Sequence, residues 1–287
     1  MRGAGPAQLA LRSQPWFGGE QREPILGGAV FRGGRADAQP PQRRGGLRHL
    51  TRLGPLPEFS PAATREDIRA AIDRRVSEAM ADLKRGRLEC LVLDDAAHLT
   101  ACGRAIWERL VELLEDGSVL GLGVSVRCPA EALAALETGD IHYLELPFNL
   151  LDWRWRECGV VAALNRHPGI TVQARDPWLQ GLLLTPPEAW PGLAGVDAHA
   201  IISRVEELAS AFGRASVADL CLAFVRGQDW IDAVELGGDA PQTAAEAFRV
   251  ALQPPLGTEE AAEVVRHLPR VPEQALDPAC WAAASRA

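Results

Sequence analysis

The chain of 287 residues is long for a minimal domain but suits one α/β barrel, so its length does not require two domains. With 47% hydrophobic and 24% charged residues, the composition is that of a globular protein with a sizeable core and excludes a fibrous or largely disordered chain. No apolar run approaches the roughly 20 residues that span a bilayer, and no secretory signal is visible. The six cysteines form no C-x-x-C pair. We therefore expect a cytoplasmic protein with no membrane partner.

The net charge of −8 is distributed unevenly. Residues 1–52 hold nine arginines against three acidic residues, a net charge of +6, which leaves −14 for the remainder. We treat residues 1–46 as an Arg/Gly/Pro-rich N-terminal segment with a partly degenerate first βα region, and 47–287 as the folded unit. A basic segment can bind nucleic acid or anionic membrane, or it can be a poorly ordered lead-in. Aromatic residues are sparse in it, so we do not expect nucleic acid as a partner.

Short apolar runs alternate with helical patterns along the folded unit. Strands are predicted at 47–53, 88–93, 120–126, 141–146, 170–174 and 231–236, with 7–12 as a further candidate. Helices are predicted after Thr64, at 105–116, 129–138 and 198–212, after Ser216, and near 241–252 and 258–267. This alternation indicates a parallel sheet with right-handed crossovers, either a closed eight-stranded barrel or an open doubly wound sheet. No G-x-G-x-x-G turn follows a strand, which counts against a Rossmann fold.

Three blocks decide between these architectures. GLGVSVRCPAEALAAL (121–136), YLELPFNLLDWRW (143–155) and VQARDPWLQGLLL (172–184) together resemble the aldo-keto reductase family, and the resemblance extends over 47–281. It implies a (β/α)8 barrel that binds NADP(H) across the carboxyl ends of its strands, the face that carries the site in barrel enzymes. Too little chain precedes FGGE (17–20) for a complete first strand and helix. We expect either a barrel that is trimmed or irregular at its first βα unit or a shortened or misassigned gene start.

The family reduces carbonyls with an aspartate, a tyrosine, a lysine and a histidine. Hydride delivery builds negative charge on the carbonyl oxygen, so a proton donor must lie there, with a cation nearby that lowers its pKa. The resemblance places Asp94 in the histidine position and Arg52, of TRL, in the lysine position. Phe17 falls in the tyrosine position, with Arg12 in the aspartate position, if two residues are inserted, whereas an ungapped match gives Gly19. The family tetrad is therefore predicted to be substituted, because the chain's one tyrosine is Tyr143, inside a strand, and its one lysine is Lys84, at the end of a helix.

The resemblance also implies a set of cofactor contacts. Ser125 matches the serine that faces the nicotinamide amide, Glu145 replaces a glutamine with an acceptor-only carboxylate, and Arg175 replaces a ring that stacks on nicotinamide. The remaining positions with cofactor contacts are Gln180, Gly237 and Gly238, beside which Asp239 would repel a phosphate. No cluster has metal-ligand spacing.

Two further groups of residues allow two interpretations each. Asp94 and Asp95 follow a predicted strand and are either a general acid–base pair or a loop start in which an aspartate caps the next helix. His98 either takes part in the same site or has no catalytic role. The tryptophans at 153, 155 and 178 either stack on a ligand or pack helix against barrel.

These observations favour an aldo-keto reductase-like barrel that has lost NADPH-dependent carbonyl reduction and acts as a binding or scaffold protein for a small molecule or protein partner. One alternative is an active NAD(P)H-dependent reductase with an atypical site, which rests on the barrel signature and Ser125. Another is a lyase or isomerase that uses Asp94 with Arg52.

Overall fold

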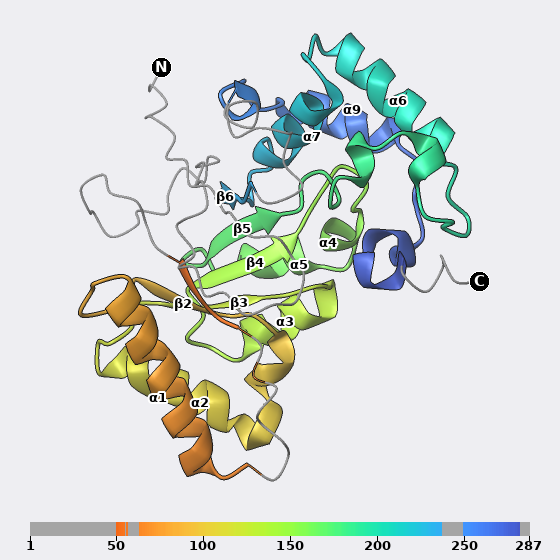
Figure 1. Ribbon diagram of the computed structural model, residues 1–287. Coiled ribbons are helices and arrows are strands. Elements are labelled where there is room, and N and C mark those ends of the chain that lie inside the picture. The colour runs from red at the N-terminus through yellow and green to blue at the C-terminus, as the bar shows by residue number, and fades with distance from the viewer. Residues whose placement is uncertain (1–49, 55, 57–62, 237–248, 282–287) are drawn as a thin grey trace.

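A computed structural model describes residues 50–54, 56, 63–236 and 249–281. Within them, six parallel strands form one sheet in sequence order, β1-β2-β3-β4-β5-β6 (Figure 1). The strands are β1 Leu50–Leu53, β2 Cys90–Leu93, β3 Leu122–Ser125, β4 Tyr143–Pro147, β5 Thr171–Arg175 and β6 Ala233–Val234. Each lies inside or overlaps a strand predicted from the sequence, and the candidate strand at 7–12 lies outside the described residues.

The helices follow the strands as βα units. They are α1 Arg65–Asp82, α2 Ala105–Glu115, α3 Pro129–Glu137, α4 Arg154–Glu157, α5 Val160–Leu164, α6 Ala198–Ala211, α7 Val217–Arg226 and α9 Thr258–His267. The predicted helix near 241–252 lies largely outside the described residues. The short helices α4 and α5 were not predicted, because four or five residues are too few to show a helical period.

Local sequence signals explain where the longer helices begin. Thr64 and Asp67 form a reciprocal capping box at the start of α1, and the Ser216 side chain accepts from the backbone N–H of Asp219 at the start of α7. Pro129 occupies the first turn of α3, where its missing N–H costs nothing. Gly117, just beyond α2, adopts a positive φ of 78°. The helix starts predicted after Thr64 and Ser216 are confirmed.

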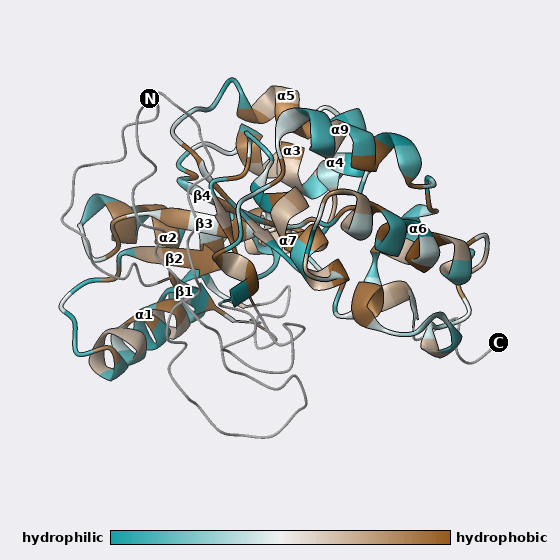
Figure 2. Ribbon diagram, turned by 90° about the horizontal axis from the view of Figure 1, so that it is seen from above, coloured by the Kyte–Doolittle hydropathy of each residue, from teal (hydrophilic) through white to brown (hydrophobic). Residues whose placement is uncertain are grey.

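The main hydrophobic core lies between the convex side of the sheet and the helices. Leu91, Leu93, Val124, Leu144 and Val172 are buried on that side of their strands. Coloured by hydropathy, β2 and β3 are hydrophobic, whereas hydrophilic residues lie along α6 and α9 (Figure 2). The alternate residues of the strands point to the concave side, as the period of two requires.

The sheet curls into a half-barrel whose two edge strands face each other. Arg52 lies on β1, at one edge, and Glu235 directly follows β6, at the other. Their side chains form an ion pair with an N–O distance of 3.2 Å. A flat sheet would separate these strands by about 24 Å, five spacings of about 4.8 Å, so the contact requires strong curvature.

Gly123 permits a close approach of strands on the concave side. It pairs with Tyr143 in the register between β3 and β4. A Cβ atom at this position would lie 2.9 Å from both the Cβ and the carbonyl oxygen of Tyr143, and 3.2 Å from Val92 Cγ2. Because one of these contacts is with backbone, a side-chain rotation cannot relieve it.

We predict that Gly123→Ala lowers the free energy of unfolding by about 1–3 kcal/mol, the usual cost of overpacking a core. Gly121→Ala is the matched control, because the nearest atoms to its Cβ would lie 3.6 Å away, an ordinary contact. Urea unfolding followed by circular dichroism measures both variants. Equal stability of the two would contradict the close approach of β3 and β4.

Candidate functional site

Polar side chains gather on the concave side of the half-barrel, near the carboxyl ends of the strands. Ser125, Glu145 and Gln173 come from three adjacent strands and stand beside one another in the strand register. Arg52 reaches them from β1, and Glu235 reaches them from the end of β6. A concave side lined by polar and charged groups at this end is where parallel barrels hold ligands.

Arg52 lies at the centre of this group and bonds three carboxylates. Its Nη1 donates to Asp94 Oδ1 at 3.0 Å, and its Nη2 donates to Glu145 Oε2 and, at 3.2 Å, to Glu235 Oε2. Its side chain is 12% exposed, against 1% for Glu145 and 7% for Glu235. We call Arg52, Asp94, Glu145 and Glu235 the Arg52 cluster.

Glu145 is the most enclosed carboxylate of the cluster. It accepts from Ser125 Oγ at 3.0 Å and from Gln173 Nε2 at 3.1 Å, in addition to Arg52. Burial opposes its ionisation and acts to raise its pKa, but the charge and hydrogen bond of Arg52 outweigh burial, so the pKa of Glu145 lies below its ordinary value. Burial likewise acts to lower the pKa of Arg52, and the carboxylates of Glu145 and Glu235 raise it to a net value above the ordinary one. The pair therefore stays ionised.

A second guanidinium approaches Glu145 from β5. Arg175 Nε lies 3.5 Å from Glu145 Oε1, and its Nη2 donates to the carbonyl oxygen of Val126 at 3.2 Å. Its Nη1 donates to Asp176, the next residue. Arg52 and Arg175 are thus both anchored on Glu145, and each also bonds an aspartate nearer to solvent, Asp94 or Asp176.

The one phenol and the one ammonium of the chain are not neighbours. Tyr143 lies on β4, two residues before Glu145, and its hydroxyl donates to Gln173 Oε1. Burial raises the pKa of this phenol well above its usual value, and the negative charge of Glu145 adds to the effect. Lys84 is exposed in the turn after α1, on the way back to the start of β2 and hence at the amino ends of the strands. It provides no cation beside Tyr143.

The two adjacent aspartates after β2 have different roles. Asp94 bonds Arg52, whereas Asp95 caps a 3-10 helix, Ala96–Leu99, by accepting from the backbone N–H of Ala97 at 2.9 Å. The predicted capping role is therefore found for Asp95, and Asp94, exposed at the start of the loop after β2, forms an ion pair with Arg52. His98 has a buried Nδ1 with no hydrogen-bond partner in the described structure.

The structure brings together five of the nine residues that the resemblance singled out: Arg52, Asp94, Ser125, Glu145 and Arg175. Gln180 is exposed in the turn after β5. The other three, Phe17, Gly237 and Gly238, lie outside the described residues. Their expected roles, like those of the five, stay predictions.

The three tryptophans serve as packing residues. The side chains of Trp155 and Trp178 are fully buried, with Nε1 atoms that donate to Asp152 Oδ2 at 2.9 Å and to the carbonyl oxygen of Ala218 at 3.1 Å. Trp153 donates to the carbonyl oxygen of Val271 at 3.0 Å. Each ring nitrogen is thus satisfied by protein, as a structural role requires.

Sequence reasoning missed Glu235 and Gln173. Both are buried polar residues inside otherwise apolar strand segments, IDAVEL and ITVQA. That interruption was the available signal, because a buried strand admits a charged or amide side chain only where a partner satisfies it. Their partners are distant in sequence, because Gln173 donates to Glu145 across 28 positions and to Glu235 across 62, and Glu235 accepts from Arg52 across 183.

Backbone strain is concentrated in the loops at the carboxyl ends of β2 and β5. Among the described residues, seven non-glycine residues have positive φ, and five of them lie there: Cys102, Arg104, Asp176, Leu179 and Gln180, with φ values between 51° and 68°. This conformation is unfavourable for side chains with a Cβ and often occurs at functional sites. The strain therefore lies on the same end of the sheet as the Arg52 cluster.

The residues at the centre of the site do not fit the nicotinamide amide that the resemblance implies. The Ser125 hydroxyl donates its one hydrogen to Glu145. Glu145 has only acceptor oxygens, and these already accept hydrogen bonds from Arg52, Ser125 and Gln173. An amide oxygen placed there would meet no available donor from these two residues. In the residues the structure describes, no group of three His, Cys, Asp or Glu could hold a metal ion, and no helix is long and apolar enough to cross a membrane.

No protein-family model and no curated protein matches this sequence. Solved structures do match. An aldo-keto reductase from Bacillus halodurans in its holo form is 18% identical over 78% of this chain and 73% of its own, with a TM-score of 0.60. Its apo form is 19% identical over 73% and 75%, with a TM-score of 0.55. A glycerol dehydrogenase from Gluconobacter oxydans is 20% identical over 71% and 66%, with a TM-score of 0.54. These likenesses show the fold: the chain is an aldo-keto reductase-like α/β barrel, as predicted.

We predict that Arg52→Met lowers the free energy of unfolding by about 3–5 kcal/mol, because it leaves buried carboxylates without their cation. Arg65→Met is the control, since the pair between Arg65 and Glu108 is exposed and is expected to contribute about 1 kcal/mol or less. Chemical unfolding at pH 7 compares them. A loss for Arg52→Met no larger than that for the control would mean that the cluster is not formed.

The lowered pKa of Glu145 predicts how stability depends on pH. A carboxyl whose folded pKa is below its unfolded value stabilises the fold above the unfolded pKa, and that contribution disappears as the pH falls through the folded pKa. The wild-type free energy of unfolding should therefore decline below about pH 4.5. Glu145→Gln should be less stable at pH 7 and decline less steeply below pH 4.5. Identical slopes for both proteins would show that folding does not change the pKa of Glu145, which contradicts the prediction.

Proposed function

We propose that this protein is an aldo-keto reductase-like barrel that binds a small molecule at its polar mouth and does not carry out NADPH-dependent carbonyl reduction. The observation that carries the proposal is the state of Arg52, which stands in the position of the family lysine and is held by Asp94, Glu145 and Glu235. A cation bound in this way is fully engaged with carboxylates and is not paired with a phenol.

Proton delivery is the step that this site is not built for. A carbonyl that receives hydride needs a donor whose pKa is close to the working pH. Tyr143 is buried with a raised pKa and its hydroxyl donates to Gln173, and Arg52 holds its protons with a raised pKa. Glu145 is ionised and saturated with donors. None of the three meets the requirement.

Binding of a small molecule is supported by two carboxylates that are exposed at the carboxyl ends of the strands. Asp94 has 37% of its side chain exposed, and Asp176 has 19%, so both present carboxylate oxygens towards solvent from a buried, fixed network. A rigid polar centre surrounded by strained loops is a preorganised surface, which reduces the entropic cost of holding a ligand. The mouth favours neutral or cationic ligands that donate hydrogen bonds, because carboxylates outnumber guanidinium groups there.

The direct test is a titration with NADPH by calorimetry, followed by assays with a panel of aldehydes and ketones. We expect no saturable binding at micromolar cofactor and no substrate-dependent oxidation of NADPH, because the nicotinamide position lacks a donor. The Bacillus halodurans reductase, assayed under the same conditions, checks that the panel is adequate. Turnover of any panel member at a rate comparable with that reductase would contradict the proposal.

The exposure of Asp94 favours a second candidate, a lyase or isomerase in which this carboxylate removes a proton. It bonds Arg52 through Oδ1 and is the most exposed member of the Arg52 cluster. If such an activity is found, Asp94→Asn should lower kcat by about 100-fold or more, the usual contribution of a general base. Asp95→Asn, which alters a helix cap and an ion pair with Arg127 outside the Arg52 cluster, should retain activity. An unchanged rate in Asp94→Asn would remove this candidate.

A further inference from the structure

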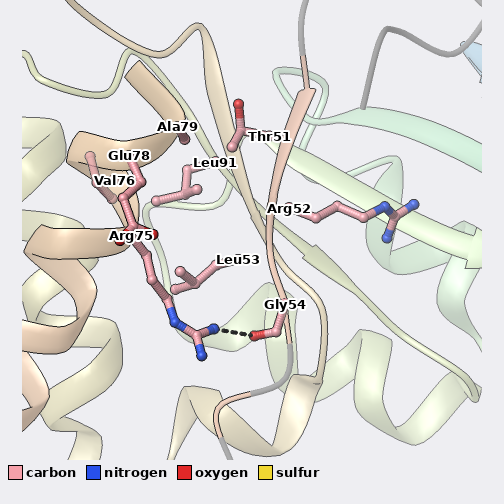
Figure 3. A pocket seen from close by; sticks show the side chains of 9 residues that line it. All are labelled: Thr51, Arg52, Leu53, Gly54, Arg75, Val76, Glu78, Ala79 and Leu91. Atoms are coloured by element: carbon pink, nitrogen blue, oxygen red, sulfur yellow. Dashed lines mark hydrogen bonds between the residues drawn. The ribbon is translucent and has the colours of Figure 1, made fainter. Parts of the chain in front are cut away.

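We draw no further inference here: the strongest candidate, the cavity of about 360 Å³ between β1 and α1 (Figure 3), carries none, because its apolar lining residues Leu53, Val76 and Leu91 are at most 3% exposed and offer a ligand little surface to bind, and nothing in the structure shows what covers the cavity.

Discussion

The charge of Arg52 must be neutralised on the concave side of the sheet, and this requirement links strands that are distant in the sheet. One guanidinium bonds carboxylates from the end of β2, the middle of β4 and the end of β6. Each of these carboxylates would be costly to bury without a cation, and the cation would be costly to bury without them. The ionised state of Glu145 depends on this arrangement, and the curvature that brings β6 back towards β1 makes the contact between Arg52 and Glu235 possible.

The residues that form the fold and those that form the Arg52 cluster lie on opposite sides of the sheet. Fold is determined by the apolar residues on the convex side, such as Leu93, Val124 and Leu144, and these are independent of what the concave side carries. A guanidinium suits this place on the concave side, because it forms several directed hydrogen bonds and keeps its proton. The carboxylates of Asp94, Glu145 and Glu235 use these donors and form an ion cluster with Arg52.

The sequence was sufficient for the six described strands and for most helices, because hydrophobic period and capping residues are local signals. Thr64 with Asp67 and Ser216 fixed helix starts that the structure confirms. It was sufficient for part of the site as well, since Asp94, Arg52, Ser125, Glu145 and Arg175 were singled out from one resemblance. The sequence could not show which of these residues contact one another. Arg52 meets Glu145 across 93 positions and Glu235 across 183, and such contacts follow from curvature and register rather than from any local pattern.

The most direct measurement of the central claim is a double-mutant cycle on Arg52 and Glu145, with Arg52→Met, Glu145→Gln and the double variant unfolded chemically at pH 7. If the two groups form a buried ion pair, the double variant should be more stable than the sum of the single losses predicts, with a coupling energy of about 2 kcal/mol or more. A coupling energy near zero would contradict the account, because it would mean that the two side chains act independently and that the cluster does not organise the concave side of the sheet.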